Sequence, residues 1–260
     1  MTSGNFEDFF TADPVPRLWG DAVIPDAWRQ QTAGMNVILA ADDTAALRVV
    51  SDAQGSTWAE SWHHDTVTRY PFPVGAPGWG METSDGRAGV LTSMGATADG
   101  SIPLTFAWRT AEGWHLEATH ARRACLSSDG SRRVADDHLV VDGNAVPLPP
   151  NLGPQCQFAR TGILFGDRGQ PAGTYTFVGF DGSVRWTRPS PPYSWWTTSE
   201  IRDTIAYSTV TKEAAYVEEF DANGHRLRTI QGAASSLYTP TGLLVTVDRN
   251  AVVTWQPAVP

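Results

Sequence analysis

The sequence is poor in lysine, in cysteine and in long apolar runs. Lys212 is the single lysine among 260 residues, and Cys125 and Cys156 are the only cysteines. Two cysteines cannot form the disulfide framework of a small secreted scaffold, and a chain of this length buries enough apolar surface to fold without one. No stretch approaches 18 uninterrupted apolar residues, which excludes a transmembrane helix. The formal net charge of −9 argues against nucleic acid or an anionic membrane as the partner.

Several sequence signatures are missing as well. The first ten residues lack a basic segment followed by an apolar one, so they do not form a secretory signal. The sequence therefore predicts a cytoplasmic monomer whose cysteines are reduced. It contains no glycine-rich dinucleotide fingerprint, P-loop, His-Glu-x-x-His, Cys-x-x-Cys or Gly-x-Ser-x-Gly motif. We therefore expect no cofactor and no metal.

Glycine and proline, by contrast, are abundant, with 24 and 18 residues. They punctuate a repeated pattern of a short strand, a tight turn closed by glycine, and a second apolar strand. The clearest copies turn at residues 236–242, 157–162 and 28–34, and looser copies turn at 81–86, 125–130 and 196–203. Six copies in this length give about 43 residues each, which is the period of a four-stranded propeller blade.

The second half of each copy supports this interpretation, because Asp-Gly turns at 142–143 and 181–182 join further strand-like runs. We predict an all-β fold over residues 1–260, a single domain forming a six-bladed β-propeller of four-stranded antiparallel blades. Five and seven blades are the alternatives. The last copy lacks a fourth strand, whereas residues 15–19 and 22–24 are strand-like and belong to no copy. An N-terminal strand is therefore expected to close the last blade.

Some of the turns resemble those of known propeller families. Residues 51–58, Ser-Asp-Ala-Gln-Gly-Ser-Thr-Trp, are similar to the Asp-box of sialidase-type propellers, although Ala53 stands where that pattern has aspartate. The Ser-Asp-Gly turns at 84–86 and 128–130 resemble the inner-strand turns of WD40-like and TolB-like propellers. In those families such turns are structural. The sialidase catalytic residues have no counterparts here, so the resemblance implies a fold and no activity.

Three tryptophans are the candidate binding residues. Trp79 ends a long loop between the first two blades, and Trp195 and Trp196 follow a proline-rich loop before the fifth. On the long-loop face, near the mouth of a central channel, their rings could stack on a sugar or an aromatic ligand. The alternative is that they fill the wedges between blades, as most of the 11 tryptophans must.

The candidate catalytic residues are His63, His64 and Asp65, placed at the start of the same long loop. A histidine beside an aspartate can act as an oriented general base, here with His64 carrying the proton and Asp65 orienting it. The alternative is a solvated turn. A metal site that adds Glu82 would need a further convergence that the sequence does not show.

Other polar groups have structural explanations. The pairs 42–43 and 136–137, Asp-Asp in both cases, are predicted at tight turns between the second and third strands of blades one and three. Paired carboxylates can serve as acid and base, but aspartate is also a common turn residue. Glu200, Arg202 and Asp203 are expected to form a salt-bridged turn. Cys125 and Cys156 are expected close together on the innermost strands of neighbouring blades.

Two functions from different classes follow. The first is an enzyme, such as a hydrolase, a lyase or a biosynthetic enzyme, or a small-molecule binder, acting on an aromatic or glycosylated ligand at the long-loop face. The second is a non-catalytic scaffold for protein–protein interaction. Fold cannot choose between them. A lectin would need one binding motif per blade, which is absent.

Overall fold

We analysed a computed structural model of the chain, which describes residues 37–41, 45–52, 54–63, 66–72, 77–82, 87–93, 97–166, 173–190, 194–239 and 241–257. These residues form 23 β-strands, and every strand pair in them is antiparallel. No helix in the described ranges is long and apolar enough to cross a membrane.

The strands form six separate sheets, each a meander of consecutive strands. The first two sheets are β1 (Val37–Ala41), β2 (Ala45–Ser51), β3 (Thr57–His63), β4 (Thr66–Pro71), and β5 (Pro77–Glu82), β6 (Ala88–Ser93), β7 (Ile102–Thr110), β8 (Gly113–Ala121). The third and fourth are β9 (Ala124–Leu126), β10 (Arg132–Ala135), β11 (His138–Val141), β12 (Asn144–Pro147), and β13 (Gln155–Phe158), β14 (Gly162–Gly166), β15 (Gly173–Gly179), β16 (Val184–Ser190). The fifth and sixth are β17 (Ser194–Ser199), β18 (Thr204–Val210), β19 (Ala215–Asp221), β20 (Arg226–Gln231), and β21 (Ala233–Tyr238), β22 (Leu244–Asp248), β23 (Val253–Gln256).

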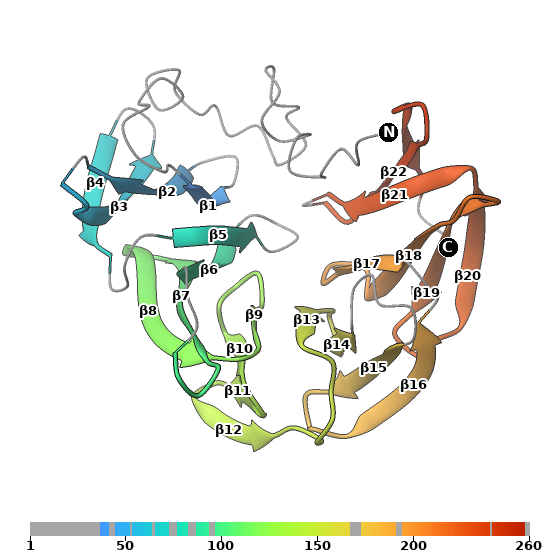
Figure 1. The fold of residues 1–260 in the computed structure, drawn as a ribbon, viewed down its shortest axis with the longest axis horizontal. Coiled ribbons are helices and arrows are strands. Elements are labelled where there is room, and N and C mark those ends of the chain that lie inside the picture. The colour runs from blue at the N-terminus through green and yellow to red at the C-terminus, as the bar shows by residue number, and fades with distance from the viewer. Residues whose placement is uncertain are drawn as a thin grey trace.

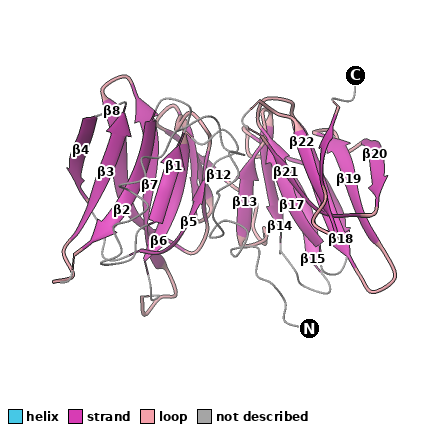
Figure 2. Cartoon of the chain, turned by 90° about the horizontal axis from the view of Figure 1, so that it is seen from above, coloured by secondary structure: helices cyan, strands magenta, loops and turns pink. Residues whose placement is uncertain are grey.

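The six sheets stand side by side around a common axis, as the blades of a propeller do (Figure 1). The first strand of each sheet lies nearest the axis and the last strand lies at the rim (Figure 1). Seen from the side, the strands run roughly along the axis (Figure 2). The all-β, propeller-like arrangement predicted from the repeat is therefore present. The sixth sheet has three strands among the described residues, and its expected partner segment, residues 15–24, lies outside them.

Antiparallel meanders place their connections alternately at two ends of each sheet. We call one end the turn face; it carries the connections from first to second and from third to fourth strand, such as 127–131, 159–161 and 200–203. The other end, the loop face, carries the connections from second to third strand and from sheet to sheet, such as 122–123, 136–137 and 148–154. Side chains at opposite faces cannot share one site.

The first sheet differs from the prediction by one strand. The repeat predicted that residues 35–40 form the second strand of this sheet, but this segment is β1, the first and innermost strand. The aspartates at 42–43 therefore fall between the first and second strands, and they lie outside the described residues. The same shift moves His63, which ends β3 at the turn face instead of beginning a long loop. His64 and Asp65 lie between β3 and β4, outside the described residues. The sheet-to-sheet connection begins only after Pro71.

Five hydrophobic clusters fill the five successive interfaces between neighbouring sheets. Leu47 and Trp114 belong to the cluster between the first and second sheets, and Ala206 and Leu244 to the cluster between the fifth and sixth. The other three clusters join the second to the third sheet, the third to the fourth and the fourth to the fifth. The described residues thus form a hydrophobic cluster at each interface between sheets that follow one another in the chain.

A disulfide bond joins Cys125 in β9 to Cys156 in β13, with their Cα atoms 5.7 Å apart. The predicted proximity of the two cysteines on neighbouring inner strands is confirmed, but the expectation that they are reduced is wrong. The bridge links the third sheet, whose strands have only three or four residues, to the fourth. It therefore fastens a sheet of short strands to its neighbour.

Breaking this bridge should destabilise the fold. It closes a loop with a sequence separation of 31 residues, for which the chain-entropy model gives about 3–4 kcal/mol of stability. We expect a reducing agent to lower the urea midpoint of the wild-type protein. The variant with Cys125→Ala and Cys156→Ala should have the lower midpoint already and should not respond to the reductant. Equal midpoints for oxidised and reduced wild-type protein would contradict a stabilising role.

Candidate functional site

The adjacent tryptophans in β17 have opposite environments. Trp196 is 3% exposed and its ring meets that of Tyr175 in the fourth sheet edge-on, with centroids 6.3 Å apart. Trp195 is 50% exposed. Side chains alternate along a strand, so neighbours point to opposite sides. The prediction placed both tryptophans in a loop, whereas both lie in the innermost strand, where alternation buries one and exposes the other.

Trp195 points toward the sixth sheet. Ser208, which pairs with it across β17 and β18, forms a hydrogen bond of 2.7 Å with Ser236 of β21. Because paired residues share a side of the sheet, Trp195 lies on that same side. It is the second residue of β17, immediately after a sheet-to-sheet connection, so it sits at the loop face. A large aromatic ring exposed on an innermost strand is the principal feature of this end of the molecule.

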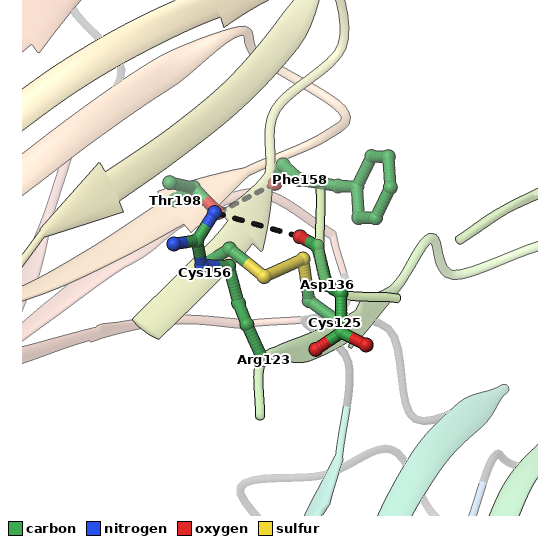
Figure 3. The surroundings of a disulfide bond; sticks show 6 residues. All are labelled: Arg123, Cys125, Asp136, Cys156, Phe158 and Thr198. Carbon is green, nitrogen blue, oxygen red and sulfur yellow. Dashed lines mark hydrogen bonds between the residues drawn. A yellow bond between two sulfur atoms is a disulfide. The ribbon is translucent and has the colours of Figure 1, made fainter. Parts of the chain in front are cut away.

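Arg123 lies at the same face, directly before β9. Its guanidinium donates to the carbonyl of Leu152 at 2.7 Å and to that of Asp136 at 3.5 Å, and its carbon atom Cζ lies 5.4 Å from the centre of the Phe165 ring. Figure 3 shows this side chain beside the disulfide, with the bond to the Asp136 carbonyl dashed. The inner strand β13 follows β9 around the axis and precedes β17 (Figure 1). Arg123 and Trp195 therefore flank β13 at the loop face.

The charge of Arg123 is held by backbone carbonyls and not by a carboxylate. Burial lowers the pKa of this guanidinium, and the nearby charges of Asp137 and Asp136 oppose that effect. Within the described ranges Arg123 forms no ion pair, and its Nε is buried without a hydrogen-bond partner. Arginine stays charged in proteins, so at this end of the third sheet the positive charge of Arg123 lies near the carboxylates of Asp136 and Asp137.

Most aspartates at the strand connections cap their own turns. In five of these turns, the carboxylate accepts a hydrogen bond from the backbone N–H two residues further on; these are Asp52, Asp99, Asp129, Asp181 and Asp248. Hydrogen bonds from Thr97 and Ser101 lower the pKa of Asp99 well below its usual value. In the Asp-box-like segment the capping oxygen comes from Asp52, so the turn forms although Ala53 lacks a carboxylate. These acids are used structurally.

The paired aspartates at 136–137 do lie between the second and third strands of the third sheet, as predicted. Asp136 has a left-handed backbone with φ of 54°, and its carboxylate accepts the N–H of Arg122 at 2.7 Å. The pair fastens a turn to the preceding sheet-to-sheet connection. No group of three metal-ligating side chains gathers anywhere in the described ranges.

Glu200 and Asp203 tie turns of different sheets together at the turn face. Glu200 accepts hydrogen bonds from the N–H and the hydroxyl of Ser128 in the third sheet, at 2.9 and 2.6 Å. Asp203 accepts the N–H and hydroxyl of Thr161 in the fourth sheet, at 3.0 and 2.7 Å. The turn was predicted to be salt-bridged, and the contacts described here are hydrogen bonds from serine and threonine to these two acids. Side-chain links thus connect the inner turns of three sheets.

Two glutamates are buried inside sheets and each contacts an arginine. Glu60 in β3 accepts hydrogen bonds from Arg48 at 2.6 Å and Arg69 at 3.1 Å. Glu219 in β19 accepts Arg228 at 2.7 Å. Burial alone would raise the pKa of Glu60, but the hydrogen bonds from Trp58 and Arg48 and the positive charges of Arg48 and Arg69 bring it below the usual value. A carboxylate fixed by two guanidinium groups is a structural ion pair.

Stability should therefore depend on Glu60 at acid pH. A group whose folded pKa is lowered stabilises the fold above its unfolded pKa, near 4.5, and loses that contribution as the pH falls through the folded value. We expect the free energy of unfolding to decrease below about pH 4.5, as measured by urea unfolding between pH 3 and pH 7. Glu60→Gln should be less stable at pH 7 and lose less stability on acidification. An equally steep acid loss in this variant would refute the contribution of Glu60.

The structure does not bring the sequence-predicted residues together. His63 lies at the turn face, Trp195 at the loop face, and Trp196 in the core. Trp79 lies within β5 and not at a loop end, and its side chain is outside the described residues. Sequence reasoning missed Arg123. The only sequence signal for Arg123 is the pair of arginines at 122–123 between two strand-like runs. That signal does not predict the hydrogen bonds of Arg123 to the carbonyls of Leu152 and Asp136.

Comparison with known proteins finds likeness in structure only. No family model matches the sequence, and no curated protein matches it. Among solved structures, a eukaryotic initiation factor shares the fold at a TM-score of 0.50 and 10% identity; the match covers 87% of this chain and 58% of that one. Sqt1 of Chaetomium thermophilum bound to the N-terminus of the ribosomal protein L10 matches with a TM-score of 0.46 and 12% identity; the match covers 80% of this chain and 68% of that one. The β-propeller domain of the Trilobed protease of Pyrococcus furiosus matches with a TM-score of 0.44 and 7% identity; the match covers 82% of this chain and 64% of that one. At these identities the likeness concerns the fold alone.

Proposed function

We propose that this protein is a binding module whose loop face holds a ligand against Trp195. The observation that carries the proposal is the exposure of this one ring on an innermost strand, beside a tryptophan that is fully packed. Keeping a large aromatic ring in contact with water at the end of a rigid sheet is unfavourable, and such exposure is typical of a residue that contacts a ligand or partner.

The ligand is expected to carry a planar or sugar ring. An indole face stacks on aromatic rings and on the apolar faces of sugars. Arg123 lies at the same face but in the third sheet, on the far side of the fourth sheet from Trp195, and the carboxylates of Asp136 and Asp137 lie near its charge. A small molecule with an aromatic or sugar ring is therefore the ligand class that Trp195 favours.

Binding is favoured over catalysis by how the polar groups are used. Among the described residues, the acids with lowered pKa values cap turns or pair with arginine, and they are spread over different sheets. An enzyme instead gathers groups with perturbed pKa values at one site. The catalytic role of His63, His64 and Asp65 stays a prediction, and it would require a site at the turn face, separate from Trp195.

The setting of the module is part of the same proposal. We propose a monomeric propeller of six blades that the N-terminal part of the chain closes, with no partner among nucleic acids or membranes. The disulfide favours an oxidising compartment over the cytoplasm, because such bonds persist there and are rare in a reducing cytosol.

A scaffold for protein–protein interaction is the second candidate. It is favoured by the turn face, where Ile201 is exposed between Glu200 and Asp203, which tie three sheets together. A surface held by such links and carrying an exposed apolar side chain suits a protein partner.

Removing the Trp195 ring should abolish ligand binding without affecting the fold. We expect 4-nitrophenyl glycosides and their phosphorylated forms, titrated into 15N-labelled protein, to shift one indole N–H signal that is missing from Trp195→Ala. The matched control is Val184→Ala, which shortens a similarly exposed apolar side chain, 48% accessible, on the outer strand β16. Binding that survives Trp195→Ala, or that is lost in both variants, would contradict the proposal.

A further inference from the structure

Trp195 is not part of the repeat that builds the sheets. It is the second residue of the innermost strand β17. In the other five innermost strands this position holds a smaller residue; these are Ile38, Gly78, Cys125, Cys156 and Ala234. Cys125 and Cys156 are each 2% exposed, whereas Trp195 is 50% exposed. The exposed ring is therefore specific to the fifth sheet and is not explained by the repeat.

The side of β17 that carries Trp195 faces a polar part of the interface with the sixth sheet. Ser208, opposite Trp195, is 2% exposed, and its hydroxyl shares the hydrogen bond of 2.7 Å with the hydroxyl of Ser236. Ser236 is partly exposed and lies opposite Thr246, whose hydroxyl accepts a hydrogen bond from the side-chain amide of Gln256 at 2.9 Å. Hydroxyl and amide groups therefore continue from the Trp195 ring into the sixth sheet.

The charged groups of this interface lie away from Trp195 or occur in equal numbers of each sign. Glu219 lies opposite Ala206, two residues further from the loop face than Ser208, and its carboxylate accepts hydrogen bonds from Arg228 at 2.7 Å and from Tyr238 at 2.9 Å. The charged residues at the loop-face ends of β18 and β22 are two bases and two acids, namely Lys212, Arg249, Glu213 and Asp248. Among the described residues, the surroundings of Trp195 therefore favour a neutral ligand over a charged one.

The chemistry of the serine pair matches that of a sugar. A hydroxyl is both a donor and an acceptor. In the bond between Ser208 and Ser236 one hydroxyl donates, so the other keeps its hydrogen for a further acceptor, and both oxygens keep lone pairs. Sugar hydroxyls have the same dual character, and the apolar face of a sugar ring stacks on an indole. A purely aromatic ligand uses the indole alone.

We infer that the ligand of Trp195 is a neutral sugar, bound with its apolar face on the indole and its hydroxyl groups toward Ser236, between the fifth and sixth sheets. The sugar ligand rests on the function proposed for Trp195 and narrows its ligand class from any ring-bearing molecule to a sugar without a charged group. This is a single site in one interface, so it needs no binding motif repeated in every sheet.

Probes that separate the sugar from the aromatic ring test the ligand class. Methyl glycosides of glucose, galactose, mannose, fucose and N-acetylglucosamine carry a sugar ring and no aromatic ring, whereas benzyl alcohol carries only the aromatic ring. We expect at least one methyl glycoside, titrated into 15N-labelled full-length protein, to shift the indole N–H signal that is missing from Trp195→Ala. Benzyl alcohol should bind about tenfold more weakly, because it leaves the serine hydroxyls unmatched.

The possible outcomes separate the sugar ligand from the binding role of Trp195. A shift with benzyl alcohol or a 4-nitrophenyl glycoside, but with none of the methyl glycosides, would overturn the sugar ligand and leave the binding role of Trp195 intact. No shift with any of these probes, or shifts that persist in Trp195→Ala, would overturn both.

Two successive serines in β21 provide matched variants. Ser235 pairs with Val247, and because side chains alternate, it faces away from the fifth sheet while Ser236 faces toward it. We expect Ser236→Ala to weaken binding of the methyl glycoside about two- to tenfold, as loss of one hydrogen bond does. Ser235→Ala should bind as the wild type does. Equal glycoside affinities of the two variants, both with wild-type amide spectra, would overturn the role of Ser236.

Removing hydroxyl groups from the ligand tests the same contact without changing the protein. Monodeoxy derivatives of the bound methyl glycoside are titrated into the wild-type protein. We expect at least one derivative to bind about two- to tenfold more weakly than its parent, because it lacks the hydroxyl that contacts the serine pair. Unchanged affinity for every monodeoxy derivative would show that no sugar hydroxyl is recognised and would overturn the sugar ligand.

Discussion

Among the described residues every backbone ladder stays within one sheet, so no hydrogen-bonded strand pair joins neighbouring sheets there. In this part of the chain the contacts between sheets depend on side chains. Apolar clusters fill the wedges between sheets, and the disulfide adds a covalent link at the third. This constraint explains why Tyr175, Trp196 and Tyr207 are buried between the fourth and fifth sheets, because a large ring spans the distance between two sheet faces.

Arginine supplies the polar part of the same contacts. Arg188 and Arg249 each donate to backbone carbonyls of the fifth sheet from a neighbouring sheet. Arg132 and Arg188 also lie over phenylalanine rings. A guanidinium can bind carbonyls in its plane while its face rests on an aromatic ring, which a lysine ammonium cannot do as well. The excess of arginine over lysine thus has a use in the fold.

The structural use of polar groups limits what the molecule can do chemically. Aspartates that form the turns and glutamates that pair with arginine are fixed by hydrogen bonds, and acids fixed in this way are poor proton carriers. Among the described residues of the loop face, Trp195 offers an exposed ring and Arg123 a positive charge. Both recognise ligands through shape and electrostatics, which is the basis for proposing binding over catalysis.

The sequence by itself determined the class of the fold. Glycine-closed turns and Asp-Gly hairpins recur because tight turns need particular backbone conformations, and these local requirements can be read without knowing the neighbours. They also placed the two cysteines on adjacent inner strands and the aspartates of 136–137 at a turn. In the first sheet the prediction was wrong by one strand: it took residues 35–40 as the second strand, whereas they contain the first strand, β1. The strand–turn–strand pattern at residues 28–40 does not tell which pair of successive strands it belongs to.

The candidate site, in contrast, was decided by tertiary structure. Which of Trp195 and Trp196 is exposed depends on the sheet that each one faces, and His63 changed faces once β3 was found to end there. Whether the cysteines are bonded depends on a separation of 5.7 Å between Cα atoms of different sheets. Burial and exposure are properties of packed neighbours far apart in the chain, so a local pattern cannot fix them.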